Sequence, residues 1–268
     1  MSPRFILRPR RLAWVLAAAV AAAATIVIPE TLAPAALAAS GAAATPSADQ
    51  IVEKYVAARG GVKKIRSILA LRETGRMTSG ADRQAVVVRE LKRPGRSRFE
   101  ITAQGTTGVF ASNGKKGWKM SPFDGDLEPK PLPEEAVQEA IEQADIEGPL
   151  VDWKAKGHRI ELVGRETVGA HEAYKLKMTL KSGATRFEYI DVKSWYRVRA
   201  DSTRTLKGVP TKVTMTFDDY KKTGGVAFAH LIEVETEGRP QKVRVVVDKI
   251  EINPAIDDAR FEQPAVQP

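Results

Sequence analysis

Hydrophobic and polar residues alternate with a period of two over most of the chain after residue 69. In the run 98–104, Phe99, Ile101 and Ala103 point one way and polar side chains the other. The runs 172–181 and 212–217 repeat this alternation. It predicts half-buried strands of an antiparallel sheet, with one face on an apolar interior and the other in water.

Turn signals between these runs, such as Asn113-Gly114 and Gly224-Gly225, predict sequential hairpins. Twelve runs fit the strand pattern, and we expect about eleven of them to be strands. The runs are 69–79, 84–92, 96–104, 106–112, 117–120, 159–167, 172–181, 185–191, 196–206, 210–221, 227–236 and 241–251.

Two segments have the period of an amphipathic helix instead. The first, 49–58, follows a capping Ser47 or Asp49, is stopped by Gly60-Gly61 and leads into a short second turn at 62–68. In the second, 133–145, the apolar residues form one narrow stripe and Glu or Asp fills much of the rest. Pro133 fits its first turn, and Gly148-Pro149 is expected to stop it.

A sheet with one apolar face must close into a filled barrel, stack on a second sheet, or curl around helices. If the two helices cover the concave side incompletely, an apolar cleft suited to acyl chains remains. The helix at 133–145 is then a movable lid; the alternative is a plain connector packed on the core. The residues expected to line this cleft, each of which could instead be ordinary core, are Phe110, Trp118, Met120, Phe123, Val137, Ile141, Leu150 and Trp153.

The N-terminus has the pattern of a secretory signal peptide. Four arginines precede an uncharged run at 12–28, and a tail of small residues ends at Ala38, where we expect cleavage. An uncleaved membrane anchor and a twin-arginine signal are the alternatives. We therefore expect a signal peptide at 1–38, a disordered spacer at 39–46, one domain at 47–264 and a tail at 265–268.

Without residues 1–38 the chain has 38 basic and 32 acidic residues, a net charge of +6. This mild excess favours contact with anionic surfaces such as lipid headgroups, but the charges form no dense run, so no nucleic acid partner is expected. The chain contains no cysteine, so its stability must come from a hydrophobic core. The exported protein is expected to be a monomer.

Enzyme motifs are not found. The histidines His158, His171 and His230 are far apart, and we expect them at the surface or in turns. The sequence has no nucleophile elbow, phosphate-binding loop or dinucleotide fingerprint. Six aspartates could be paired as acids, but local turn hydrogen bonds explain such residues as well: Asp191, Asp201, Asp218, Asp219, Asp257 and Asp258. We expect no catalysis, no metal and no cofactor.

The order of these parts resembles the periplasmic outer-membrane lipoprotein-sorting proteins, whose LolA/LolB-like fold RseB-type stress regulators share. The resemblance depends on the amphipathic start 51–61, the Asn113-Gly114-Lys115-Lys116-Gly117-Trp118 corner, and the Pro/Glu helix after it. The strand segments 172–176 and 187–191, the segment from 217–220 to 228–230 and the ending 252–261 add to it.

This resemblance implies a mainly β protein with a few helices, an open, strongly curved antiparallel half-barrel whose concave face the helices cover. It implies a periplasmic carrier that binds the acyl chains of lipoproteins or of another envelope lipid for outer-membrane sorting. A partner protein in the inner or outer membrane is left open. The alternatives are an RseB-type stress sensor without transport and, last, an envelope hydrolase.

Overall fold

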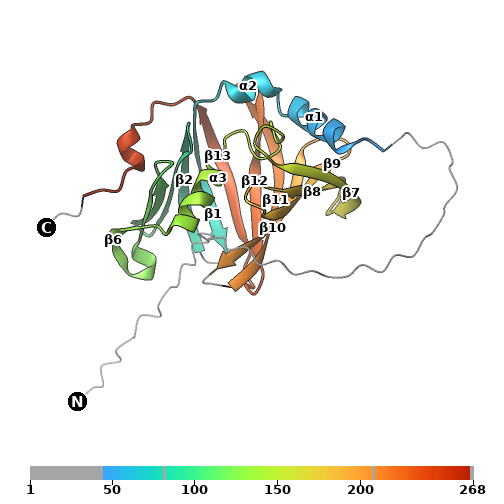
Figure 1. Ribbon diagram of the computed structural model, residues 1–268. Coiled ribbons are helices and arrows are strands. Elements are labelled where there is room, and N and C mark those ends of the chain that lie inside the picture. Colours follow the sequence, from blue (N-terminus) through green and yellow to red (C-terminus); the bar gives the residue numbers. More distant parts are fainter. Residues whose placement is uncertain (1–44, 81–82, 207–208, 266–268) are drawn as a thin grey trace, which may run out of the picture.

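Thirteen strands of the described residues form one open antiparallel sheet (Figure 1). The structure is a computed structural model, and it describes residues 45–80, 83–206 and 209–265. The signal peptide predicted at 1–38, its cleavage after Ala38 and most of the predicted spacer lie outside these residues. The strands follow the order β6-β5-β4-β3-β2-β1-β13-β12-β11-β10-β9-β8-β7. Consecutive strands therefore pair with each other except β6 and β7, which form the two edges, and β1 pairs with β13 to join the two halves.

The strands are β1 (Ala70–Ser79), β2 (Arg83–Lys92), β3 (Arg96–Ala103), β4 (Thr106–Ser112), β5 (Gly117–Ser121), β6 (Asp126–Pro131), β7 (Arg159–Val168), β8 (His171–Thr179), β9 (Thr185–Asp191), β10 (Arg197–Leu206), β11 (Val209–Thr223), β12 (Val226–Thr236) and β13 (Val243–Ile252). The helices are α1 (Ala48–Ala58), α2 (Val62–Arg66) and α3 (Glu134–Gln143), with 3-10 turns η1 (Pro122–Asp124) and η2 (Asp258–Phe261).

All twelve predicted runs are strands, so the expectation of about eleven was too low. The strand that the pattern missed is β6, which contains Pro129 and Pro131. Proline cannot donate a backbone hydrogen bond to a neighbouring strand, so its presence in a sequence argues against predicting a strand there. β6 is an edge strand, where one side of the backbone needs no partner.

The helix ends show which caps the sequence identified. Ser47 is the N-cap of α1 and forms a capping box with Gln50. Pro133 is the N-cap of α3 and not a residue of its first turn. The helix ends at Gln143, five residues before Gly148 begins the predicted stop, and the chain continues in a loop stabilised by ion pairs of Asp145 and Glu147.

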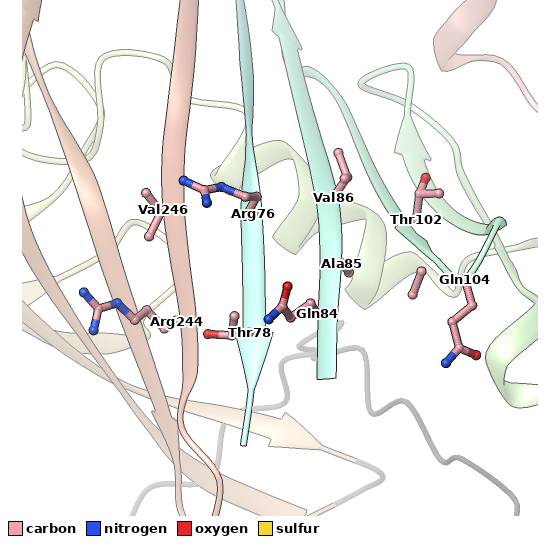
Figure 2. Close-up of a pocket in the computed structure, with 10 residues that line it drawn as sticks. Arg76, Thr78, Gln84, Ala85, Val86, Thr102, Gln104, Arg244 and Val246 are labelled. Carbon is pink, nitrogen blue, oxygen red and sulfur yellow. The ribbon is translucent and has the colours of Figure 1, made fainter. Parts of the chain in front are cut away.

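Register defines two faces of the sheet. We call the face that carries Leu71, Leu91 and Val247 the inner face, and the other the outer face. The outer face of β13, β1, β2 and β3 has a shallow groove of about 450 Å³, into which Arg76 and Arg244 project (Figure 2). α3 lies behind the sheet in this view, so the groove and α3 are on opposite sides.

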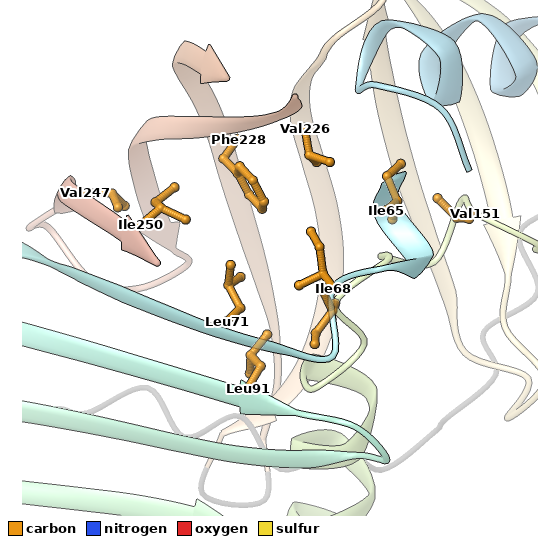
Figure 3. Packing of buried hydrophobic residues seen from close by; sticks show 10 residues of the cluster. Ile65, Ile68, Leu71, Leu91, Val151, Val226, Phe228, Val247 and Ile250 are labelled. Carbon is orange, nitrogen blue, oxygen red and sulfur yellow. The ribbon is translucent and has the colours of Figure 1, made fainter. Parts of the chain in front are cut away.

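The core lies on the inner face. Ile65 and Ile68 from the α2 region pack on Leu71, Phe228 and Val247 of three strands (Figure 3). A second cluster joins the apolar side of α1 to β7, β8 and β9 and contains Ile51, Val52, Tyr55, Leu150, Ile160, Tyr174, Leu176, Met178 and Ile190. The end of α1 is held against β12, where Ala227 N donates to Arg59 O at 2.8 Å.

Part of the outer face is covered by the chain after β13. Phe261 in η2 is 1% exposed, and its carbonyl accepts a hydrogen bond from Trp118 Nε1. Arg260 pairs with Glu90 at 2.7 Å and with Glu100 at 3.1 Å. This C-terminal segment covers one end of the outer face of β1 to β5, where Ala70, Glu90 and Trp118 are buried.

We expect Leu176→Ala to lower the free energy of unfolding by about 3 kcal/mol, because Leu176 is fully buried between α1 and the sheet. Urea unfolding followed by circular dichroism measures this. Leu127→Ala is the control: Leu127 is 73% exposed, and its loss should change stability by less than about 0.5 kcal/mol. Equal effects of the two substitutions would contradict the placement of the core.

Candidate ligand-binding site

α3 contacts two parts of the sheet that are far apart in strand order. On one side, Ser97 Oγ of β3 donates to Ala140 O at 3.3 Å. On the other, Arg204 Nη1 of β10 pairs with Glu139 Oε1 at 2.8 Å. Five strands separate β3 from β10 in the sheet. α3 therefore bridges two strands that share no ladder.

The apolar side of α3 packs on the first of these parts. Val137 Cγ2 lies 3.2 Å from the position that a Cβ would take at Gly117, and Ile141 Cγ2 lies 3.6 Å from the corresponding position at Gly95. A Cβ at Gly117 would also meet Leu132 Cδ1 at 2.9 Å, so glycine lets α3 approach β5 closely here without a shift of the Leu132 side chain.

Glu139 is the buried acid of this helix. Burial raises the pKa of Glu139 to about 7, although the Arg204 guanidinium and the hydrogen bond from Gln143 act in the opposite direction. Burial lowers the pKa of Arg204 as well, against the effect of Glu139. The pair is thus held in surroundings that favour its neutral forms.

Ion pairs fix the loop that follows α3. Glu147 Oε1 accepts from Arg93 Nη2 at 2.9 Å, and Glu147 O accepts from Arg59 Nη1 at 2.6 Å. Lys156 Nζ contacts Asp145 Oδ2 at 2.5 Å and Glu147 Oε2 at 3.6 Å. These contacts tie the C-terminal end of α3 to α1 and to the β2–β3 turn.

Four of the eight predicted site residues lie at the inner face in the part of the sheet formed by β3, β4 and β5. Val137 and Ile141 lie on the side of α3 that faces β3, β4 and β5. Phe110 pairs with Phe99 in register and lies on the inner face of β4. Phe123 approaches the inner face at Gly108, 3.1 Å from the position of a Cβ there. These four residues share one end of the inner face.

The other four residues lie elsewhere. Leu150 and Trp153 belong to the cluster around α1. Since Gly117 faces α3, the next residue, Trp118, points to the outer face, and so does Met120. Both pack with Val109 and Ala111, and Trp118 is buried beneath the C-terminal segment. The sequence alone did not show this, because no local pattern indicates which face the distant residue Phe261 covers.

Sequence reasoning missed Glu139, Ser97 and Arg204 as contact residues of the helix. Glu139 is one of the acidic residues that fill the helix outside its apolar stripe, and Arg204 lies in the predicted strand run 196–206, where the sequence indicates no role for it. Sixty-five residues separate the two partners in the chain. No local pattern in the sequence could pair them.

The aspartates and histidines have structural partners. Burial would raise the pKa of Asp201, but hydrogen bonds from Arg199, Thr214 and Tyr189 hold it below its ordinary value. Asp191 accepts hydrogen bonds from Ser194 N and Oγ in a tight turn. The expectation that every histidine lies at the surface or in a turn is wrong for His230, which is 8% exposed and lies within β12 with Nδ1 2.7 Å from Val247 O.

Two further searches covered the described ranges of the chain. No group of three or more histidine, aspartate or glutamate side chains there is arranged to hold a metal ion. No helix among those same residues is long and apolar enough to cross a membrane.

Comparisons with known proteins support the fold. No protein-family model matches the sequence, and no curated protein matches it significantly. Among solved structures, a DUF1329 family protein from Desulfovibrio piger superposes with a TM-score of 0.56 at 14% identity, over 81% of this chain and 98% of that one. A LolA superfamily protein from Nitrosomonas europaea gives 0.52 at 13% identity, with the same coverage.

A third structure is an outer membrane lipoprotein-sorting protein domain from Vibrio parahaemolyticus. It superposes with a TM-score of 0.51 at 14% identity and covers 79% of this chain and 94% of that domain. At such low identity the likeness extends to the fold and not to the ligand. The chain is therefore similar in structure to LolA-superfamily proteins and has a LolA-like, mainly β fold.

Proposed function

We propose that this protein is a periplasmic carrier that binds the acyl chains of lipoproteins or of another envelope lipid between α3 and the inner face of the sheet. The observation that carries the proposal is the bridging position of α3, packed on β3 and β5 through apolar residues and joined to β10 through Glu139. The LolA-like fold and the N-terminal signal pattern support the location and the class of ligand.

The bridge supports a strongly curved sheet with α3 over its concave face. From β3 to β10 there are six steps along the sheet, which span about 29 Å if the sheet is flat. A helix is only about 10–12 Å across with its side chains. α3 reaches both strands if the sheet bends around it, and the register shift at Thr74/Gly75 is one place where a strand bends.

The proposed lining is the set of apolar residues under α3, namely Phe110, Phe123, Val137 and Ile141. Leu150 and Trp153 would extend it toward α1. Trp118 and Met120 are left out because they point to the outer face. In this proposal the protein binds and does not catalyse, since the aspartates that could serve as acids are held in structural hydrogen bonds.

α3 is the proposed lid. Its C-terminal end is tied down by Glu147, while two polar contacts join the helix to the far part of the sheet: the Glu139–Arg204 pair and a hydrogen bond of 3.5 Å from Ser182 Oγ to Glu142. Loss of these contacts would free the helix from the far part of the sheet and open the space beneath it. A lid fixed along one side and held on the other by two polar contacts can move as a gate.

The mature protein purified from bacterial membranes should carry lipid that solvent extraction and mass spectrometry detect. Ile141→Asp should weaken binding of a neutral fluorescent acyl probe at least about tenfold, because it places a charge against the apolar lining. Leu127→Asp, at an exposed position, should leave binding unchanged. A protein without lipid that binds no acyl probe would refute the carrier function.

A disulfide between Gly117→Cys and Val137→Cys should lock α3 on β5. The chain has no cysteine of its own. Val137 Cγ2 lies 3.2 Å from the position of a Cβ at Gly117, so the two cysteine side chains can meet once the end of the Leu132 side chain turns away. We expect the release rate of a bound acyl probe to fall to about a tenth or less in the oxidised double variant, because the lid cannot open. Dithiothreitol should restore the rate, and each single variant serves as control. Equal release rates before and after reduction would exclude a moving α3.

The stability of the protein should fall as pH rises from about 4.5 to about 7 through the titration of Glu139. The folded protein keeps this proton to a pKa of about 7 whereas the unfolded chain loses it near 4.5, so low pH favours the fold. The difference is up to about 3 kcal/mol. Urea unfolding at about pH 5 and about pH 8 should show this loss in the wild type and not in Glu139→Gln. Parallel pH profiles would contradict the burial of Glu139; exposed Glu135→Gln is the matched control.

A further inference from the structure

A group of charged side chains lies on the strands that face Glu139. We call it the arginine cluster: Arg186 and Glu188 of β9, Arg197 and Arg204 of β10, and Glu139 of α3. Arg186 Nε lies 2.7 Å from Glu188 Oε1, and Arg197 Nη1 lies 3.5 Å from Glu188 Oε2. The third pair is Arg204 with Glu139 at 2.8 Å.

Register places the whole cluster on the inner face. Ile190 packs in the core against α1. Glu188 and Arg186 share its face because they lie two and four residues before it on β9. Arg186 pairs with Ser202, so Arg204 is on that face too, two residues further along β10. Arg197 pairs with Ile190. The cluster therefore faces the space over which α3 lies.

The cluster is incompletely satisfied. Five of its buried side-chain polar atoms make no hydrogen bond of good geometry, and three of these five are in contact only as ion pairs: Arg186 Nε with Glu188 Oε1, and Glu188 Oε2 with Arg197. The other two, Glu139 Oε2 and Arg197 Nε, have no hydrogen-bond partner in the described part of the chain. Glu188 itself has no exposed side-chain surface. Buried polar groups in folded proteins are nearly always hydrogen-bonded, so these two atoms point to a missing partner.

The charges indicate the sign of that partner. Three arginines face two buried carboxylates, of which burial keeps Glu139 partly protonated at neutral pH, and the exposed Glu142 of α3 also acts on Arg204. Arg186 adds to the lowering of the pKa of Arg204 that burial causes, which places these two guanidinium groups within repulsive range. An excess of buried positive charge is costly unless an anion offsets it.

The arginines can still be reached. The side chains of Arg197 and Arg204 remain 21% and 23% exposed, so a ligand can contact them. Guanidinium groups present paired donors that match the two oxygens of a carboxylate or phosphate.

We propose that the arginine cluster binds the anionic head of an amphiphile, a carboxylate or a phosphate, while its acyl chain lies along the apolar residues under α3. The inference rests on the proposed carrier function and adds the class of headgroup to it. Arg186, Arg197 and Arg204 supply the donors, and Glu188 holds two of the three in place. A neutral lipid leaves the excess charge unpaired.

The test compares two fluorescent probes with the same chain, cis-parinaric acid and its methyl ester, at about pH 8, where the acid is ionised. The wild type should bind the acid about tenfold or more tightly than the ester, as expected for hydrogen bonds to a charged group. Arg204→Gln should bring this ratio close to one, and Arg244→Gln, a 54% exposed arginine on the outer face, should not change it.

Because a single arginine substitution leaves a buried carboxylate unpaired, the double variant Arg186→Gln/Glu188→Gln is a second test that removes the pair together. Circular dichroism and urea unfolding establish that each variant is folded. The comparison of acid and ester in the wild type depends on no variant at all.

Equal affinity of the wild type for acid and ester would overturn the headgroup site and leave the acyl carrier standing. Failure to bind either probe would overturn both. Displacement by a fatty acid and by a lysophosphatidic acid of the same chain length then separates a carboxylate from a phosphate source. If neither displaces the probe better than the matching neutral monoacylglycerol does, the cluster holds only water and the proposal fails.

Discussion

The structure depends on one constraint, which is that a single sheet must bury an apolar face without a second sheet to pack on it. Thirteen strands carry apolar residues toward the inner face, and three short helices with their connecting loops are what covers it in the described residues. α1 and α2 do this by direct hydrophobic packing, with Tyr55 and Ile65 among the fully enclosed side chains. α3 does it with a narrower stripe and a polar contact.

The two kinds of contact give the helices different roles. Burial of large apolar side chains stabilises α1 strongly and holds it in one place. α3 buries less, and its link to β10 is an ion pair whose desolvation offsets much of its attraction. Regions with few buried apolar contacts open most easily. α3, which lies above Phe110 and beside the arginine cluster, is therefore the part of the cover that opens at the lowest free-energy cost.

The outer face follows the same rule on a smaller scale. Where the C-terminal segment crosses β1 to β5, the outer face is buried, and Trp118, Phe261 and the Glu90–Arg260 pair hold the segment there. Where no segment crosses, the same face is an open groove lined by Arg76 and Arg244 (Figure 2). Burial of a strand residue is thus decided by which distant segment lies above it.

The sequence by itself determined the local structure: the twelve strand runs, both amphipathic helices and the cap at Ser47, because period, turn residues and capping groups act over a few positions. The sequence did not predict β6, because its prolines are tolerated only in an edge strand, and the sequence does not show which strand is at the edge. Only the tertiary structure decided that Trp118 turns away from α3, that Glu139 meets Arg204, and that three arginines and two carboxylates gather on β9, β10 and α3. These facts depend on contacts between residues far apart in the chain. The alternation of apolar and polar residues predicts that a side chain is buried, but it does not indicate which distant segment buries it.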